Sequence, residues 1–497
     1  MNKIILVTSI SPKEIENQQM ALNSWINAGF DIISCNIKEE IESVKKFFPK
    51  VHFEEMKRDG RSIMGKPCPF IYDMLQVAQK HAEDICGIIN SDIHLRKFTP
   101  QMYSYICKYA QSRVLFIRRN DVDTLEDIND FRFRMFFAGV DAFFFNKKNI
   151  DILEDDGLLI GQAMWDYWLP IMFYEKGIQI NEIINPILFH IKHTLRWSDD
   201  ITNDISWKIC KKHFPQIERE NAVYFLKDRF FHIISSLDMQ ICISSDSLKS
   251  KSVLIICKPE IEERINKQLC FQTHENVKLA SSVKPNEEYD YYIKLPYTVS
   301  LCYSFIDNIL WIMENYAIPA MKMMVYVRGN KTKDLHIDNC CNRALDRLNC
   351  DLQAITVKKK EYNTEEPKSP QICSTYCGSV LVEEDEQKIW KRDGFSGKTV
   401  VYPAGYMARL WVRRYRNIDT NLHLIGFADS SESMQNKIVE GLKVYGTDIV
   451  MQQQKYDKIV IVSNLHMEEI YDILRKNVPE EKLVVWNEFG LRNLIEG

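Results

Sequence analysis

The sequence predicts an α/β protein with three domains, and three observations support this. The chain has 497 residues, more than a single hydrophobic core usually organises. Short apolar runs alternate with longer amphipathic stretches, as strands alternate with helices in parallel sheets. This alternation restarts after charged stretches at residues 249–251 and 358–367. We therefore expect a doubly wound sheet at residues 1–238, a middle α/β domain at 250–357 and a small domain at 396–497.

Composition and charge exclude several classes of protein. Hydrophobic residues make up 45% of the chain and charged residues 27%, which is typical of a globular protein. The formal net charge of -4 gives no basis for nucleic-acid binding, which needs a basic surface. The 14 cysteines show neither paired CxxC motifs nor zinc-ligand spacing, so we expect reduced thiols in a cytosolic protein.

The sequence predicts no membrane-spanning segment. No apolar run approaches the roughly 20 residues that a membrane helix needs. The apolar part of the N-terminus, residues 4–7, is too short for a secretion signal. We therefore expect a cytoplasmic protein, with membrane association, if any, peripheral at the inner face. The oligomeric state stays open.

The first domain begins with a strand, a helix and a second strand. An apolar run at residues 4–7 ends in Thr8 and Ser9, a helix is expected at 14–28, and the next strand at 31–35. Thr8 and Ser9 then follow the carboxyl end of a strand, where a nucleotide base or ribose could bind. Ordinary turn and capping chemistry is the alternative for each.

A loop and a helix lead to the next strand. Residues 57–69 are rich in Gly, Pro and cations, and their Arg61 and Lys66 could neutralise a diphosphate. A solvated basic loop is the alternative. A helix is expected at residues 70–82.

The strand predicted at Ile85–Ile89 ends abruptly in Asn90, Ser91 and Asp92. Because ligands gather at the carboxyl ends of strands in open α/β sheets, Asp92 could hold a divalent cation such as Mg²⁺ or Mn²⁺. The alternative is an Asx turn, because Asn-Ser-Asp is also common turn chemistry.

Two further polar positions follow along the chain. A helix is expected at residues 100–111, a strand at 113–117 and a polar turn at 118–123, in which Arg118 is an expected contact to the donor. Asp141 precedes an aromatic strand at 142–145 and could reach a donor or acceptor hydroxyl. A turn carboxylate is the alternative reading of Asp141.

Asp166 lies among the aromatic residues Trp165, Tyr167 and Trp168 near an expected helix start. Burial among rings raises the pKa of a carboxyl group toward that of a useful general base, whereas a helix N-cap is the alternative. His190 and His193, three residues apart at an expected strand end, could bind a metal or contact phosphate. A structural role is the alternative for this pair.

The order of these segments resembles that of the GT-A-fold glycosyltransferases, which use nucleotide-diphospho-sugar donors. The resemblance implies that Asp92 matches the second acid of the Asp-x-Asp metal element, that Asp166 is the base, and that His190 or His193 completes the metal shell. It also implies a divalent metal, Mn or Mg, as cofactor. Asn90, an expected contact to the donor, departs from the pattern because it stands where the first acid is expected. The resemblance covers about 235 of the 497 residues.

The rest of the chain again reads as α/β. The expected strands are 252–257, 277–280, 289–295, 323–327, 399–402, 422–427, 458–462 and 482–486, with helices at 260–268, 303–316, 406–415 and 467–476. The last four strands look like a small Rossmann-type domain in which Asp429 could meet a ribose. Pro403-Ala404-Gly405 lacks the full glycine fingerprint, which favours a structural or partner-docking role.

These inferences predict a glycosyltransferase that moves a sugar from a nucleotide-diphosphate donor to a glycan or lipid-linked acceptor. The resemblance and the modular architecture suggest bacterial surface-polysaccharide synthesis. The alternatives are a non-catalytic nucleotide-binding scaffold, in which Asn90 marks a lost metal site, and a bifunctional enzyme whose C-terminal domain acts on the sugar nucleotide.

Overall fold

A computed structural model gives the architecture of the chain in two compact units. The first comprises residues 1–249 and 306–317, and the second residues 250–305 and 318–497. The expected division into three domains stays a prediction. The structure describes residues 3–129, 134–162, 164–193, 198–234, 239–280, 288–295, 299–301, 303–318, 320–324, 326–327, 354–360, 371–372, 380–382, 397–405, 408–409, 412, 422–453, 455–462 and 467–486. Over these residues no helix has the length and apolarity needed to cross a bilayer.

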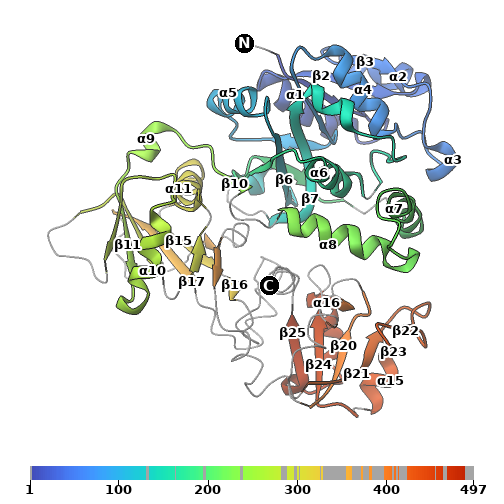
Figure 1. The fold of residues 1–497 in the computed structure, drawn as a ribbon, viewed down its shortest axis with the longest axis vertical. Coiled ribbons are helices and arrows are strands. Elements are labelled where there is room, and N and C mark those ends of the chain that lie inside the picture. The colour runs from blue at the N-terminus through green and yellow to red at the C-terminus, as the bar shows by residue number, and fades with distance from the viewer. Residues whose placement is uncertain are drawn as a thin grey trace. The chain divides into compact units, whose positions relative to one another are not determined.

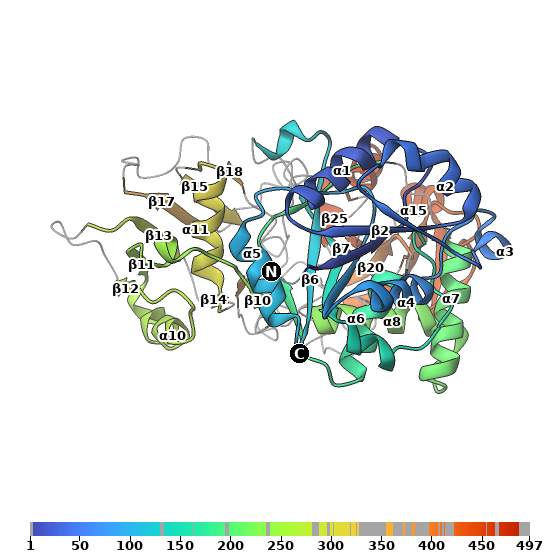
Figure 2. The ribbon, with the colours of Figure 1, turned by 90° about the horizontal axis from the view of Figure 1, so that it is seen from above.

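The first unit is built on a ten-stranded sheet, in the order β10-β8-β6-β7-β4-β1-β2-β3, with β9 paired to both β5 and β6. Helices α1 and α2 lie on one side of this sheet, and α4 and α6 on the other (Figure 2). The strands are β1 Ile5–Thr8, β2 Asp31–Asn36, β3 His52–Glu55, β4 Ile85–Ile89, β5 Ile93–Leu95, β6 Val114–Val122, β7 Arg134–Asn146, β8 Ile180–Ile183, β9 Leu188–Ile191 and β10 Gln240–Ile241.

The helices of the first unit are labelled in Figure 1. They are α1 Ile15–Asn27, α2 Lys38–Val44, α3 Arg61–Met64, α4 Ile71–His81, α5 Pro100–Tyr109, α6 Trp165–Glu175, α7 Asp199–His213, α8 Ala222–Ile234, α9 Asp246–Lys249 and, from the later segment, α11 Phe305–Asn315.

Strand β4 lies at the centre of the sheet because its sequence is suited to burial on both faces. All five of its residues are buried, and it pairs with β1 on one side and β7 on the other. Isoleucine favours the extended backbone of a buried strand. Gly87 is required by close packing, because a Cβ there would lie 2.3 Å from the carbonyl oxygen of Phe143. The strand therefore delivers Asn90 and Asp92 to the sheet edge from a rigid base.

The α/β class is confirmed, but most of the turn expected at residues 118–123 is strand, and Asp141 lies within a strand rather than in a turn ahead of one. Residues 118–122 continue β6, because Asn120, Asp121 and Val122 pair with β9 and so find backbone partners. Asp141 lies inside β7, which runs unbroken from Arg134 and pairs antiparallel with both β4 and β6. The sheet is therefore mixed rather than wholly parallel.

The second unit contains three sheets, in the orders β12-β11-β13-β17-β15-β18, β14-β19-β16 and β22-β23-β21-β20-β24-β25. Its described elements are β11 Val253–Cys257, α10 Pro259–Leu269, β12 Val277–Ala280, β13 Tyr291–Leu295, β14 Val299–Leu301, β15 Ala320–Met324, β16 Tyr326–Val327, β17 Ala354–Lys359, β18 Gln371–Ile372, β19 Val380–Val382, β20 Gly397–Tyr402, β21 Leu422–Asp429, β22 Ile438–Val439, β23 Leu442–Gly446, α15 Thr447–Gln453, β24 Lys458–Val462, α16 Met467–Leu474 and β25 Leu483–Trp486.

The last of these sheets has the strand arrangement of a Rossmann-type domain. Strands β23, β21, β20, β24 and β25 are all parallel, and the order reverses at β20. Asp429 lies near this point, but its carboxylate accepts hydrogen bonds from the backbone N–H of Ala404 at 2.9 Å and of Ser431 at 2.8 Å. Of the helix expected at residues 406–415, only 408, 409 and 412 are described.

Candidate functional site

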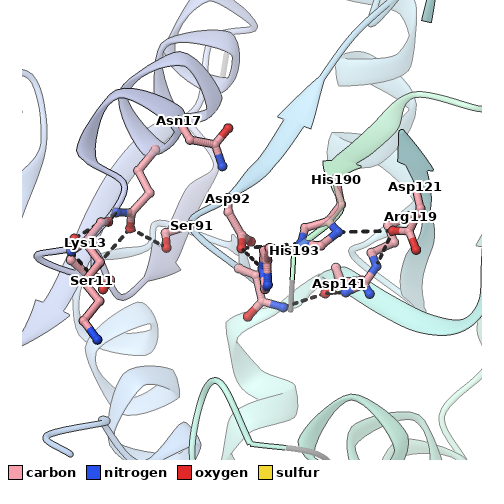
Figure 3. Close-up of polar contacts among 12 residues, drawn as sticks. Ser11, Lys13, Asn17, Ser91, Asp92, Arg119, Asp121, Asp141, His190 and His193 are labelled. Atoms are coloured by element: carbon pink, nitrogen blue, oxygen red, sulfur yellow. Dashed lines mark hydrogen bonds and ion pairs between the residues drawn. The ribbon is translucent and has the colours of Figure 1, made fainter. Parts of the chain in front are cut away.

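Charged side chains from segments far apart in the sequence lie together at the carboxyl end of β4, and Figure 3 shows those from β6, β7, β9 and the turn after β4. The turn after β4 supplies Asn90 and Asp92, and β7 supplies Asp141, since Ala142 pairs with Ile89. The remaining residues come from the end of β6 (Arg119 and Asp121), from β9 and the residues after it (His190 and His193), and from the first turn of α6 (Asp166).

Asp92, His190 and His193 form a compact set of metal-binding groups. One carboxylate oxygen of Asp92 lies 3.6 Å from Nε2 of His190 and 3.4 Å from Nε2 of His193. The two imidazole rings are 4.8 Å apart between centroids. Because all three ligand atoms lie within 4.8 Å of one another, they surround a space into which a single ion can bind.

Asp121 fixes the orientation of the His190 ring. The two residues are register partners on β6 and β9, and Nδ1 of His190 lies 3.1 Å from Oδ1 of Asp121. An Nδ1–H that donates to Asp121 directs Nε2 toward Asp92 and His193. A carboxylate behind a histidine in this way fixes its tautomer and makes it a better metal ligand.

Arg119 joins this group to a second carboxylate. Its Nε lies 3.1 Å from Asp121, and its Nη1 lies 3.4 Å from both oxygens of Asp141. Asn90, at the position where the family pattern has an acid, donates from Nδ2 to Oδ1 of Asp141 at 2.5 Å. Asn90 thus contacts Asp141 and is not one of the three metal-binding groups.

The pKa values follow from this arrangement of charges. Burial raises the pKa of Asp92, but the hydrogen bonds and charges of His190 and His193 outweigh it and hold that pKa well below its usual range. Burial lowers the pKa of His190, but hydrogen bonds to Asp121 and Asp92 raise it to about 9. Without a metal, His190 is therefore a cation between two carboxylates at neutral pH.

Asp166 differs from the other carboxylates of the site. Burial raises its pKa, the negative charge of Asp141 raises it further, and Arg119 opposes this only in part, so the pKa is about 7. Hydrogen bonds from the backbone at Asp166 and Tyr167, in the first turn of α6, also oppose the rise. A carboxyl group with this pKa exchanges protons readily at neutral pH.

Gln18 ties the loop after β1 to the turn that carries Asp92. Its Oε1 accepts hydrogen bonds at 2.8 Å from the backbone N–H of Ser11 and from the hydroxyl of Ser91. Its Nε2 donates to the carbonyl oxygens of Ser11 at 2.8 Å and Lys13 at 2.6 Å. Gln18 is itself buried on α1, so the loop and the turn are held to a rigid helix.

The other residues expected to contact a donor lie in different surroundings. Thr8 is buried at the end of β1, and its hydroxyl has no hydrogen-bond partner among the described residues, whereas the hydroxyl of Ser9 accepts from Asn36 at 3.3 Å. Arg61 is exposed on α3 and forms an ion pair with Asp59 at 2.9 Å, and Lys66 is half-buried in the following loop.

Arg118 is not part of the charged cluster. It is buried and forms a paired contact with Glu182 of β8. Because successive residues of a strand point to opposite faces, the neighbouring Arg119 reaches the site instead. Arg119 and Asp121 were missed because residues 118–123 read as a turn. The charged residues at positions 119 and 121 are separated by one uncharged residue, and this spacing, typical of one face of a strand, could have identified them.

The donor groups present fit a divalent cation that accepts both nitrogen and oxygen. Neighbouring ligands of an ion at about 2.1 Å lie about 3.0–3.4 Å apart, close to the spacing around Asp92. Imidazole ligands suit transition metals, whereas Mg²⁺ prefers oxygen, so the set favours Mn²⁺ over Mg²⁺.

Comparisons with known proteins give only distant similarities. No protein-family model and no curated protein matches the chain. A crystal structure of S. aureus TarS 1–349 in complex with UDP-GlcNAc is 13% identical, with a TM-score of 0.31, and the match covers 47% of this chain and 73% of that one. TarS 1–349 in complex with UDP is 14% identical with a TM-score of 0.29, and the match covers 47% of this chain and 72% of that one. A crystal structure of S. aureus TarS is 12% identical with a TM-score of 0.29, and the match covers 46% of this chain and 44% of that one. TM-scores this low assign neither a fold nor a function.

Proposed function

We propose that this protein is a glycosyltransferase that uses a nucleotide-diphosphate sugar as donor and a divalent cation, Mn²⁺ in preference to Mg²⁺. The observation that carries the proposal is that Asp92, His190 and His193 lie together at the edge of the sheet where ligands of open α/β folds bind. Arg119 and Asp141 link this group electrostatically to Asp166, whose pKa is about 7.

In the proposed reaction, the first requirement is to hold the donor diphosphate. Asp92, His190 and His193 are the ligands of the cation, with Asp121 behind His190. When bound, the cation supplies positive charge that stabilises the departing diphosphate oxygen. Ser9, half-buried beyond the end of β1, is proposed to contact the base or ribose, whereas the Thr8 hydroxyl is buried beneath it.

Asp166 is the proposed general base. The oxygen of an acceptor hydroxyl attacks the anomeric carbon of the sugar, the bond from that carbon to the diphosphate oxygen breaks, and the hydroxyl proton passes to the Asp166 carboxylate. Asp141, which is paired with Arg119 and Asn90, acts on this step by raising the pKa of Asp166. The acceptor is proposed to be a glycan or a lipid-linked saccharide in bacterial surface-polysaccharide synthesis at the inner face of the membrane.

A panel of nucleotide sugars, tested with and without Mn²⁺, tests the proposal. Slow hydrolysis of at least one donor is expected, because water replaces the acceptor hydroxyl, and the hydrolysis should depend on Mn²⁺. Thermal stabilisation by a nucleotide sugar without any hydrolysis or transfer would instead support a non-catalytic nucleotide-binding protein.

A further inference from the structure

A second set of metal-binding side chains lies on β3 and at the end of α4, away from the charged cluster at Asp92. It consists of His52, Glu54 and His81, whose ligand atoms all lie within 4.8 Å of one another. Nε2 of His52 is 3.6 Å from a carboxylate oxygen of Glu54, and Nε2 of His81 contacts the same oxygen. The two imidazole rings are 5.3 Å apart between centroids.

Local structure brings these three groups together. His52 and Glu54 are two residues apart on β3, so their side chains leave the same face of the strand. His81 is the last residue of α4, where the partial negative charge of the helix end favours a cation. Strand β3 is at the edge of the ten-stranded sheet and has β2 as its neighbour on one side.

We propose that His52, Glu54 and His81 form a zinc site that fastens the edge strand β3 to the C-terminal end of α4. Two imidazoles and one carboxylate are a donor set that Zn²⁺ accepts, with water completing a tetrahedral shell. Tetrahedral ligands of Zn²⁺ lie about 3.4 Å apart. Side-chain rotations that bring the more distant atoms together by at most about 1.4 Å, and that move His81 away from the Glu54 oxygen it now contacts, complete the site. The site is independent of the proposed transferase function.

Lys80 competes with the metal for Glu54. Its ammonium group lies 3.0 Å from the same carboxylate oxygen, and this contact is the main reason that the pKa of Glu54 is lowered to about 2. The Lys80 side chain is 66% exposed and can move into solvent when an ion binds. Removing the Lys80 ammonium group should therefore strengthen metal binding at His52, Glu54 and His81. If the three residues form only an ion-paired cluster, the same change should not increase zinc affinity.

Calorimetric titration of the full chain with ZnCl₂ tests the proposal. A Cys270→Ser background removes the exposed thiol among the described cysteines, and Asp92→Ala disables the other metal set. In that background zinc should bind to this set, and His81→Asn or Glu54→Gln should weaken binding at least about tenfold. Lys80→Ala should strengthen it.

The matched control is His423→Asn, which alters an exposed histidine on β21 of the second unit. It should leave the zinc affinity unchanged. Zinc should also raise the unfolding temperature of the parent background but not that of His81→Asn, because a ligand of the folded state stabilises only the chain that binds it. Equal zinc affinity in the parent and His81→Asn chains, or weaker binding in Lys80→Ala, would overturn the proposal. Neither result bears on donor hydrolysis.

Discussion

At the scale of single residues, the site combines carboxyl groups with opposite protonation behaviour. Asp92 stays ionised because two histidines contact it, whereas Asp166 has a pKa of about 7 because of burial and the nearby charge of Asp141. Two carboxyl groups whose pKa values are driven apart by their surroundings typically divide the roles of charge stabilisation and proton transfer.

Turnover should follow the ionisation of Asp166. A general base must be deprotonated to act, so the rate of transfer should rise with pH through about 7 and level off above it. Asp166→Asn should reduce turnover by about 10²–10⁴-fold while leaving donor affinity intact. The matched control is Asp204→Asn, because Asp204 lies on α7 and forms an exposed ion pair with Arg219. It should leave turnover and donor affinity unchanged. A pH–rate profile and steady-state kinetics measure this, and normal turnover of Asp166→Asn would exclude it as the base.

Asp121 should act on the metal only through His190. Asp121→Asn removes the charge that orients the His190 ring and should weaken Mn²⁺ binding by about 10–100-fold. Asp123→Asn changes a carboxylate two residues away whose side chain is 78% exposed, and should have no such effect. Mn²⁺ affinity measured by electron paramagnetic resonance on the three chains tests this. Equal affinities would show that Asp121 does not position a metal ligand.

At the scale of elements, strand continuity decided which site residues the sequence could reveal. Asp92 was identified because an apolar run ends just before it, as β4 does. Asp121 was not, because a run of polar residues reads as a turn unless its pairing with β9 is known. Whether a polar segment forms a strand depends on pairing with strands distant in the sequence, and the local residue pattern does not contain this information.

Gln18 shows how one element supports the site. Gln18→Leu would remove three hydrogen bonds to the backbone of Ser11 and Lys13, each of which contributes about 0.5–1.5 kcal/mol net. We expect a lower free energy of unfolding in urea and weaker donor binding. Gln19→Leu, one position along α1, removes a single bond to the carbonyl of Phe47 and should have a much smaller effect. Equal losses in the two variants would contradict this role for Gln18.

At the scale of the whole molecule, the sequence predicted the class of fold better than its details. The α/β class and the position of Asp166 in the first turn of α6 are confirmed. The antiparallel course of β7 could not be predicted, because strand direction depends on connections and packing rather than on local pattern. Arg118 was expected at the site because residues 118–123 read as a turn, whereas in strand β6 its side chain pairs with Glu182.

The second unit carries no charged cluster comparable to the one at Asp92 among its described residues. In its Rossmann-type sheet the Asp429 carboxylate accepts hydrogen bonds from the backbone N–H groups of Ala404 and Ser431. These contacts are consistent with a structural role for Asp429. The residues of the proposed transferase site all lie in the first unit.

Binding of a nucleoside diphosphate in the presence of Mn²⁺ is the most direct test of the central claim, that Asp92 anchors a donor diphosphate. The measurement is calorimetric titration of the wild-type chain, Asp92→Ala and the exposed-carboxylate control Asp123→Ala. We predict Mn²⁺-dependent binding to the wild type and to Asp123→Ala, and a loss of at least about tenfold in Asp92→Ala. Equal, Mn²⁺-independent affinity in all three chains would contradict the claim.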